Sequence, residues 1–131
     1  MAQFVILRDQ DAHPECRAVK GRLVDICRRA GKQDSLVRIA CRELESFYLA
    51  DLAAVEKGLN QSGLARRQNK IKFRNPDSIS SPSRELANLT GGQYQKVGGS
   101  RAIAPHLDLD NQRSSSFKNL VARLRRLLSQ A

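Results

Sequence analysis

The sequence has few of the residues that stabilise small disulfide-bonded or metal-binding folds. Only three of its 131 residues are cysteine, Cys16, Cys27 and Cys41, and only two are histidine. No two cysteines form a Cys-x-x-Cys pair, so neither a disulfide framework nor a structural zinc site is indicated. All three cysteines lie among apolar neighbours, which favours packing as small hydrophobic side chains and predicts a reducing, cytoplasmic environment.

Long apolar runs are also absent. No segment approaches the roughly 20 apolar residues that cross a bilayer, and the N-terminus has no charged lead followed by an apolar core. The sequence therefore predicts neither secretion nor a membrane span. The length suits one domain with its own core. We expect residues 1–59 to form a βαβα unit and residues 60–131 to form a basic region of helices and loops within that domain.

Acidic residues are scarce in the second half of the chain. The net charge is +10. Residues 1–58 contain ten basic and nine acidic residues, whereas residues 59–131 contain thirteen basic and four acidic residues. A strongly basic surface favours a polyanionic partner, most often nucleic acid. The alternative is an ordinary solvated surface of lysine and arginine.

The most informative stretch is Phe4–Asp11, with the sequence FVILRDQD. Four consecutive apolar residues predict a strand covered on both faces, as in a parallel α/β sheet. Side chains at i and i+2 of a strand point to the same side, so Asp9 and Asp11 are candidate ligands of one hard cation such as Mg²⁺ or Mn²⁺. The alternative is a polar loop in which Asp11 helps to cap the next helix.

Two further elements complete a βαβ unit. Apolar residues recur at helical spacing over Pro14–Ala30, and Gly31 is expected to end this helix. Ser35–Ala40 then predicts a second strand. A strand, a helix and a strand within so short a span predict a right-handed crossover with parallel strands. The expected fold class is therefore α/β, with a small, mainly parallel sheet flanked by helices.

The next helix is expected over Cys41–Leu59, with Asp51 able to cap or break it midway. Glu43 and Glu45 lie near its start and would meet Asp9 and Asp11 at the carboxyl edge of neighbouring strands. Such a cluster would supply several oxygen ligands to a divalent cation. Acids at a helix start also complement the helix dipole without any metal, so both interpretations stay open.

The second half contributes candidate phosphate-binding residues. The segment Gln61–Arg74 is expected to be an irregular loop, and its cations surround the aromatic Phe73, which suits contacts to a nucleic-acid backbone. A short helix is expected over Ser83–Leu89, with Pro82 in its first turn and Gly91-Gly92 after it. The segment Lys96–Arg101 contains two glycines, whose backbone N–H groups are candidates to hold a phosphate. The phosphate-binding candidates are Arg66, Arg67, Lys70, Lys72, Arg74, Lys96, Ser100 and Arg101.

The clearest helix is predicted over Ser114–Gln130, where apolar residues form a continuous stripe. Packing of this stripe onto the sheet is the favoured interpretation. A basic amphipathic helix also suits binding to a membrane surface or to a partner protein.

Four segments together resemble a Toprim-like bacterial family, a domain of unknown function, over nearly the whole chain. The segments are FVILRDQD, RIACRELESFYLADLAAVE, LARRQNKIKFRNPD and YQKVGGSRAIAPHLD. The resemblance implies a small α/β module that binds Mg²⁺ and promotes phosphodiester chemistry, with Asp9 and Asp11 matching the Toprim DxD pair. Toprim relatives carry a further strand and helix, with a glutamate, ahead of the DxD strand. We expect either that Met1 is an internal start or that this version works without that unit.

These observations lead to a functional expectation. We expect a Mg²⁺-dependent, nuclease-like domain with Asp9, Asp11 and Glu43 as catalytic residues and Glu45 as a further metal ligand. The alternative is a non-catalytic subunit that binds nucleic acid or a partner ATPase. The resemblance also implies a role in defence against foreign DNA, and an open sheet edge favours pairing with a second copy of the chain as a homodimer.

Overall fold

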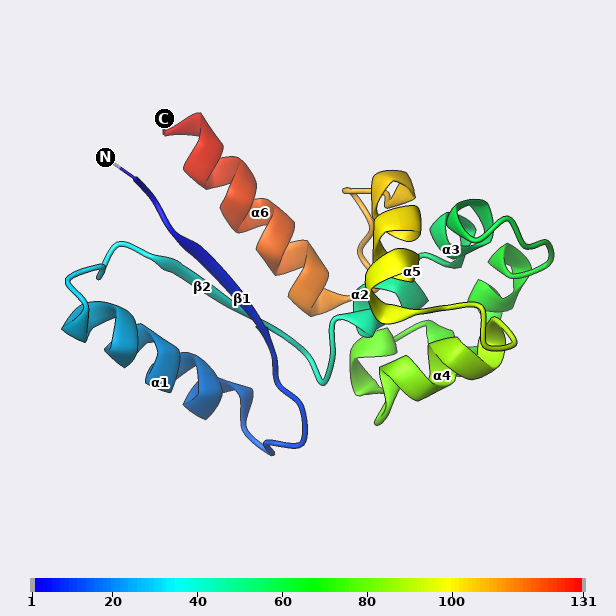
Figure 1. Cartoon of the computed structure of the whole chain (residues 1–131), viewed down its shortest axis with the longest axis horizontal. Helices are drawn as coiled ribbons and strands as arrows, with labels where there is room; N and C mark the ends of the chain where they lie inside the picture. The colour runs from blue at the N-terminus through cyan, green and yellow to red at the C-terminus, as the bar shows by residue number, and fades with distance from the viewer. Residues whose placement is uncertain (1, 131) are drawn as a thin grey trace.

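The computed structural model describes residues 2–130. Two strands and six α-helices follow one another along the chain, with four short 3₁₀ helices among them (Figure 1). In order they are β1 (Val5–Asp9), α1 (Cys16–Arg29), β2 (Leu36–Ala40), α2 (Glu45–Leu49), α3 (Leu52–Gly58), η1 (Ala65–Asn69), η2 (Ile71–Phe73), η3 (Pro76–Ser78), α4 (Pro82–Leu89), α5 (Lys96–Ile103), η4 (Ala104–His106) and α6 (Ser115–Ser129).

β1 and β2 form a parallel two-stranded sheet, in register from Val5 opposite Leu36 to Asp9 opposite Ala40. The connecting helix α1 ends at Arg29, with Ala30 as its C-cap. The next residue, Gly31, has a φ of +72°, the left-handed conformation that glycine adopts without strain. Both α1 and α6 pack against β2, and the strand pair lies between these two helices in the view of Figure 1. The α/β fold class and the parallel βαβ unit are therefore confirmed.

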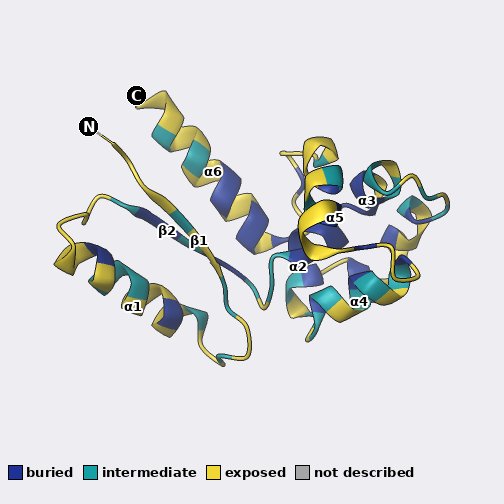
Figure 2. Ribbon diagram, viewed as in Figure 1, coloured by how far each residue is buried: buried dark blue, intermediate teal, exposed yellow. Residues whose placement is uncertain are grey.

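The expectation that the first strand is buried on both faces is wrong. β2 is buried along most of its length, whereas β1 is largely exposed (Figure 2). The side chains of Val5 and Leu7 are 43% and 41% exposed. Within the described residues β1 has β2 as its single strand neighbour, while the helices pack on β2. Apolar composition predicted the strand correctly but not which elements cover it.

The helix expected over Cys41–Leu59 is divided into α2 and α3. Asp51 adopts a non-helical conformation between them, and its Oδ1 accepts a hydrogen bond from the N–H of Ala54 at 3.2 Å. The expected break at Asp51 is therefore confirmed. The first helical residue is Glu45 rather than Cys41, because Arg42 has a φ of +64° and cannot belong to a right-handed helix.

The main core lies among α2, α3, α4 and α6. Phe47 of α2 meets Phe117 of α6 with the ring centroids 5.2 Å apart, and the fully buried Leu52 and Leu86 belong to the same cluster. The expected helices α4 and α6 are both present, with Pro82 in the first turn of α4. Packing of α6 onto the sheet is confirmed by its contacts with β2.

The N-terminus of α6 is tied to the rest of the molecule by polar contacts. Ser114 caps the helix through a hydrogen bond from Phe117 N–H to its Oγ, and the Ser114 hydroxyl donates to Asp77 Oδ1 at 2.6 Å. The N–H of Cys41, just beyond β2, donates to Ser116 Oγ at 3.3 Å. These bonds place the start of α6 beside the carboxyl end of the sheet. Over residues 2–130, every helix is too short or too polar to cross a membrane.

Candidate functional site

The carboxyl ends of β1 and β2 are held together by the residues that follow them. The N–H of Gln10 donates to the carbonyl oxygen of Ala40 at 3.0 Å, and Gln10 Oε1 accepts from the N–H of Arg42 at 3.2 Å. Asp9 Oδ1 accepts from the N–H of Leu44 at 2.8 Å. The segment after β1 and the segment after β2 therefore meet at one edge of the sheet, as expected from a parallel pair.

Asp9 is half-buried at this edge, and its pKa is raised. Removal of its carboxylate from water is the largest cause, and the hydrogen bond from Leu44 N–H opposes it. The negative charges of Glu45, Asp11 and Glu43 raise the pKa further. The other three acidic residues that the sequence singled out thus lie within electrostatic reach of Asp9.

Asp11 lies on the exposed turn that follows β1. Its φ of +56° is in the left-handed region, which aspartate tolerates better than most residues. Its N–H donates to the carbonyl oxygen of Arg42 at 2.6 Å. The N-cap residue of α1 is Glu15, whose side chain makes no cap hydrogen bond and whose N–H donates to His13 Nδ1 at 3.1 Å. Asp11 therefore does not cap α1, and that interpretation is wrong.

Glu43 is bound to the beginning of α4 rather than to its own helix. Its Oε1 accepts from the N–H and the hydroxyl of Ser83 at 3.1 Å each, and its Oε2 lies 2.9 Å from the same hydroxyl. A carboxylate beside the free N–H groups of a helix start is electrostatically favourable. Glu43 therefore complements a helix dipole, as one interpretation of the sequence proposed. The helix, however, is α4 and not the one that follows Glu43 in the chain, and the sequence did not indicate that α4 lies beside Glu43.

Glu45 is almost fully enclosed, with 4% of its surface exposed. The hydroxyl of Tyr94 donates to Glu45 Oε1 at 2.8 Å, and Ser100 Oγ lies 3.4 Å from the same hydroxyl. Burial is the main reason that the pKa of Tyr94 is raised, and the neighbouring Glu45 raises it further. The sequence predicted neither Ser83 nor Tyr94 as partners of these acids, since no local pattern links residues 40 or more positions apart.

The acids fit a small metal site better than a large one. Within residues 2–130, no three His, Cys, Asp or Glu side chains are arranged to hold a metal ion. The carboxylates of Glu43 and Glu45 already accept hydrogen bonds from Ser83 and Tyr94. Mg²⁺, however, commonly takes one or two carboxylates and fills its remaining positions with water and phosphate oxygens. Asp9 and Asp11 supply two carboxylates near this edge, but β1 ends at Asp9 and Asp11 is left-handed, so the rule that i and i+2 of a strand face the same side does not apply to this pair.

A groove of about 330 Å³ lies between α4 and the start of α5. It is lined by Ser83 and Tyr94, the partners of Glu43 and Glu45, and by the cations Arg84 and Lys96. The sequence singled out Lys96 but not Arg84. The groove therefore places two positive charges beside Ser83 and Tyr94, the residues that bind Glu43 and Glu45.

The basic segment 66–74 lies on the other side of α4. A hollow of about 170 Å³ is lined by Arg67, Lys70 and Lys72 together with Glu85 of α4. Lys72 forms an ion pair with Glu85 and lies 5.1 Å from the centroid of the Phe73 ring. Arg66 and Arg74 are exposed, and Arg74 Nε donates to the carbonyl oxygen of Asn69 at 3.1 Å. This segment consists of 3₁₀ turns rather than an open loop.

The glycines of segment 96–101 lie in the first turns of a helix, and phosphate binding by this segment stays a prediction. Gly98 and Gly99 lie inside α5, and the N–H of Gly99 donates to the carbonyl oxygen of Gln95 at 2.6 Å. A Cβ atom added to Gly99 would lie 2.5 Å from Tyr94 Cδ1. Gly99 is therefore required for close packing against Tyr94, while the exposed Arg101 projects from the same helix.

The structure defines a small α/β protein with acidic residues at one sheet edge and a basic groove whose residues Ser83 and Tyr94 bind Glu43 and Glu45. The chain belongs to the family described as Domain of unknown function (DUF4276), whose model matches residues 2–125. No curated protein and no solved structure matches the chain.

Proposed function

We propose that this chain is a Mg²⁺-dependent, Toprim-like nucleic-acid-processing domain of the nuclease type. The observation that carries the proposal is that two residues connect the acids to the basic groove. Ser83 and Tyr94 line the groove and at the same time bind Glu43 and Glu45. A phosphodiester bound in the groove would therefore contact the residues that hold these two acids.

Each group in this arrangement has a proposed role. Asp9 and Asp11 hold the divalent cation, which, when bound, supplies Lewis-acid activation of a phosphodiester and a water of lowered pKa. Arg84 and Lys96 position the phosphate, and the cations of segment 66–74 extend the binding surface across α4. Glu43 and Glu45 fix α4 and Tyr94 around the groove. This assigns them a positioning role, in place of the ligand role expected from the sequence.

The double substitution Asp9→Asn and Asp11→Asn tests the metal site. In the wild-type chain Mg²⁺ should raise the thermal unfolding temperature and permit cleavage of a labelled oligonucleotide. The double variant should lose both effects and still bind the oligonucleotide. Asp25→Asn is a matched control, because Asp25 lies on α1 and pairs with Arg29 at 2.6 Å. Cleavage that survives in the double variant would overturn the assignment.

A second candidate is a non-catalytic nucleic-acid-binding subunit. It is favoured by the hydrogen bonds that Glu43 and Glu45 accept from Ser83 and Tyr94. These bonds leave Asp9 and Asp11 as the acids available to a metal ion. The two candidates differ in one assay. Binding that weakens steeply with salt, without cleavage in Mg²⁺ or Mn²⁺, would establish the second candidate.

The remaining expectations stay predictions of the sequence. These are a defence role, a partner ATPase, a homodimer and a cytoplasmic location. The last is supported by the three cysteines, all of which carry free thiols.

A further inference from the structure

A second basic cleft lies away from the acidic edge, between α1, β2 and α6. Its volume is about 430 Å³, and residues 34–38 line it along β2. Lys20 and Val24 contribute from α1, and Arg123, Arg126 and Leu127 contribute from α6. Three elements that are distant in sequence thus bring their side chains to one cavity. Cavities of this size are typical of sites for small ligands.

The charges in this cleft are not balanced. Lys20, Arg38, Arg123 and Arg126 line it, and Asp34 is the single acidic residue in its wall. Within residues 2–130, none of the four cations forms an ion pair with a carboxylate. Four unpaired positive charges around one cavity repel one another, and a bound anion would remove that repulsion.

Two observations concern the positions of Lys20 and Arg38 in this cleft. The pKa of Lys20 is lowered, mainly by burial and then by the positive charges of Arg38 and Arg123. Arg38 Nε is buried and has no hydrogen-bond partner among the described residues. Buried N–H groups nearly always have an acceptor. An orphaned guanidinium donor inside a basic cavity therefore points to an anionic acceptor from outside the chain.

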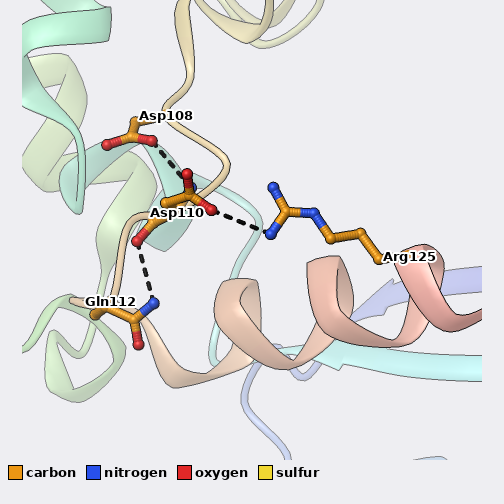
Figure 3. Close-up of polar contacts among 4 residues, drawn as sticks. All are labelled: Asp108, Asp110, Gln112 and Arg125. Carbon is orange, nitrogen blue, oxygen red and sulfur yellow. Dashed lines mark hydrogen bonds and ion pairs between the residues drawn. The ribbon is translucent and has the colours of Figure 1, made fainter.

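Arg125 of α6, unlike the four cations of the cleft, forms an ion pair. Its Nη1 donates to Asp110 Oδ1 at 3.1 Å, so its charge is paired outside the cleft (Figure 3). Arg123 and Arg126 flank it in sequence and line the cleft instead. Neighbouring arginines on one helix thus have different environments, and this provides an internal control.

We propose that the cleft between α1, β2 and α6 binds a phosphate group, with Arg38 and Arg123 as its principal donors and Lys20 and Arg126 as flanking charges. Guanidinium groups donate paired hydrogen bonds that match the oxygens of phosphate. The phosphate belongs either to a polynucleotide or to a small phosphorylated molecule. The inference does not depend on the proposed metal site, since none of the acids of the sheet edge lines this cleft.

Titration calorimetry of the full chain with pyrophosphate, in Mg²⁺-free buffer at low salt, tests the proposal. The wild-type chain should bind pyrophosphate saturably at one site. Arg123→Gln and Arg38→Gln should each weaken binding roughly tenfold or more, because each removes charged hydrogen bonds. Arg125→Gln should leave the affinity within about twofold, since Arg125 faces Asp110. Arg123 is exposed on α6, so its variant keeps the test valid if Arg38→Gln fails to fold.

A spectroscopic measurement follows Arg38 directly. The side-chain Nε–H resonance of Arg38 should shift on addition of pyrophosphate, because the orphaned donor gains an acceptor. The Arg125 resonance should not shift. A shift of both resonances, or of neither, would contradict a specific phosphate site.

The source of the phosphate is distinguished by a second ligand. If Arg123→Gln weakens binding of a single-stranded oligonucleotide as well as pyrophosphate, the cleft binds a polynucleotide backbone. If it weakens pyrophosphate binding alone, the ligand is a small phosphorylated molecule.

The proposal is overturned if the wild-type chain does not bind pyrophosphate, if Arg125→Gln and Arg123→Gln have equal effects, or if an acidic peptide displaces pyrophosphate as effectively as inorganic phosphate does. Asp9→Asn with Asp11→Asn should leave pyrophosphate binding intact, which separates failure here from failure of the metal site.

Discussion

The hydroxyl of Tyr94 donates a 2.8 Å hydrogen bond to the buried carboxylate of Glu45, although 49 residues separate them in sequence. Tyr94 precedes α5 and Glu45 begins α2, so this bond joins the groove to α2. A buried carboxylate is strongly destabilising without a donor. The Tyr94–Glu45 pair therefore holds the wall of the proposed phosphate groove in place.

Tyr94→Phe should destabilise the fold, because it removes the donor and leaves Glu45 buried. We expect a loss of about 1–3 kcal/mol in the free energy of unfolding, measured by urea denaturation. Glu45→Gln should have a smaller effect, since its amide oxygen can still accept from Tyr94. In the double variant the two losses should not add. Fully additive losses would contradict a direct interaction.

Gly98 and Gly99 are neighbours in α5 with opposite environments. A Cβ atom at Gly99 would collide with the Tyr94 ring, whereas nothing lies within 4 Å of one at Gly98. Gly98→Ala should stabilise the protein by about 0.5–1 kcal/mol through its higher helix propensity. Gly99→Ala should destabilise it, by about 1–3 kcal/mol, through overpacking. Urea denaturation of the two variants checks both signs, and stabilisation by Gly99→Ala would exclude close packing with Tyr94.

Local chemistry made much of the fold predictable from the sequence. Apolar spacing predicted β2, α1 and α6, and Gly31 and Asp51 ended or divided helices where their conformational preferences indicated. These signals depend on residues within one or two turns of each other. The same locality explains the error at β1, because the apolar run Phe4–Leu7 shows strand propensity but not how many neighbours pack against it.

The candidate site was only partly predictable. The parallel strands brought the segments after β1 and β2 together, as predicted. The joint use of Asp9 and Asp11 as metal ligands stays a prediction, since Asp11 lies beyond the end of β1. Hydrogen bonds between segments that are distant in sequence could not be predicted from local spacing. Gln68, for example, accepts from the N–H of Leu52 and donates to the carbonyl oxygens of Leu49 and Phe73. The cleft cations Lys20, Arg38 and Arg123 likewise meet only after the chain has folded.

Glu56 is expected to make stability depend on pH. Hydrogen bonds from the N–H groups of Ala65 and Leu64 lower its pKa, the one from Ala65 most strongly. Because the folded pKa is lowered, the unfolded chain binds the proton more tightly, and the stabilisation is present above the ordinary glutamate pKa of about 4.3. It is lost as pH falls through the folded pKa.

Glu56→Gln should therefore lower the urea midpoint at pH 7, and the difference from wild type should shrink in acid. Glu85→Gln is a suitable control, because Glu85 pairs with the side chain of Lys72 rather than with backbone N–H groups. A midpoint difference that is constant from neutral to acidic pH would show that the charge of Glu56 does not matter.

Asp51 joins two parts of the chain through one carboxylate. Its Oδ1 accepts from Ala54 N–H at the start of α3, and its Oδ2 accepts from Asp108 N–H at 2.8 Å. Asp51→Ala should cost about 2–3 kcal/mol of stability, because a helix cap and a long-range hydrogen bond are lost together. Asp51→Asn keeps a single acceptor oxygen and should lose about half as much. Amide hydrogen exchange at Ala54 and Asp108 will show which bond survives in that variant.

Asp110→Ala is the control from the same loop, since the 78% exposed side chain of Asp110 makes a surface ion pair with Arg125. Equal effects of Asp51→Ala and Asp110→Ala would contradict the bridging role.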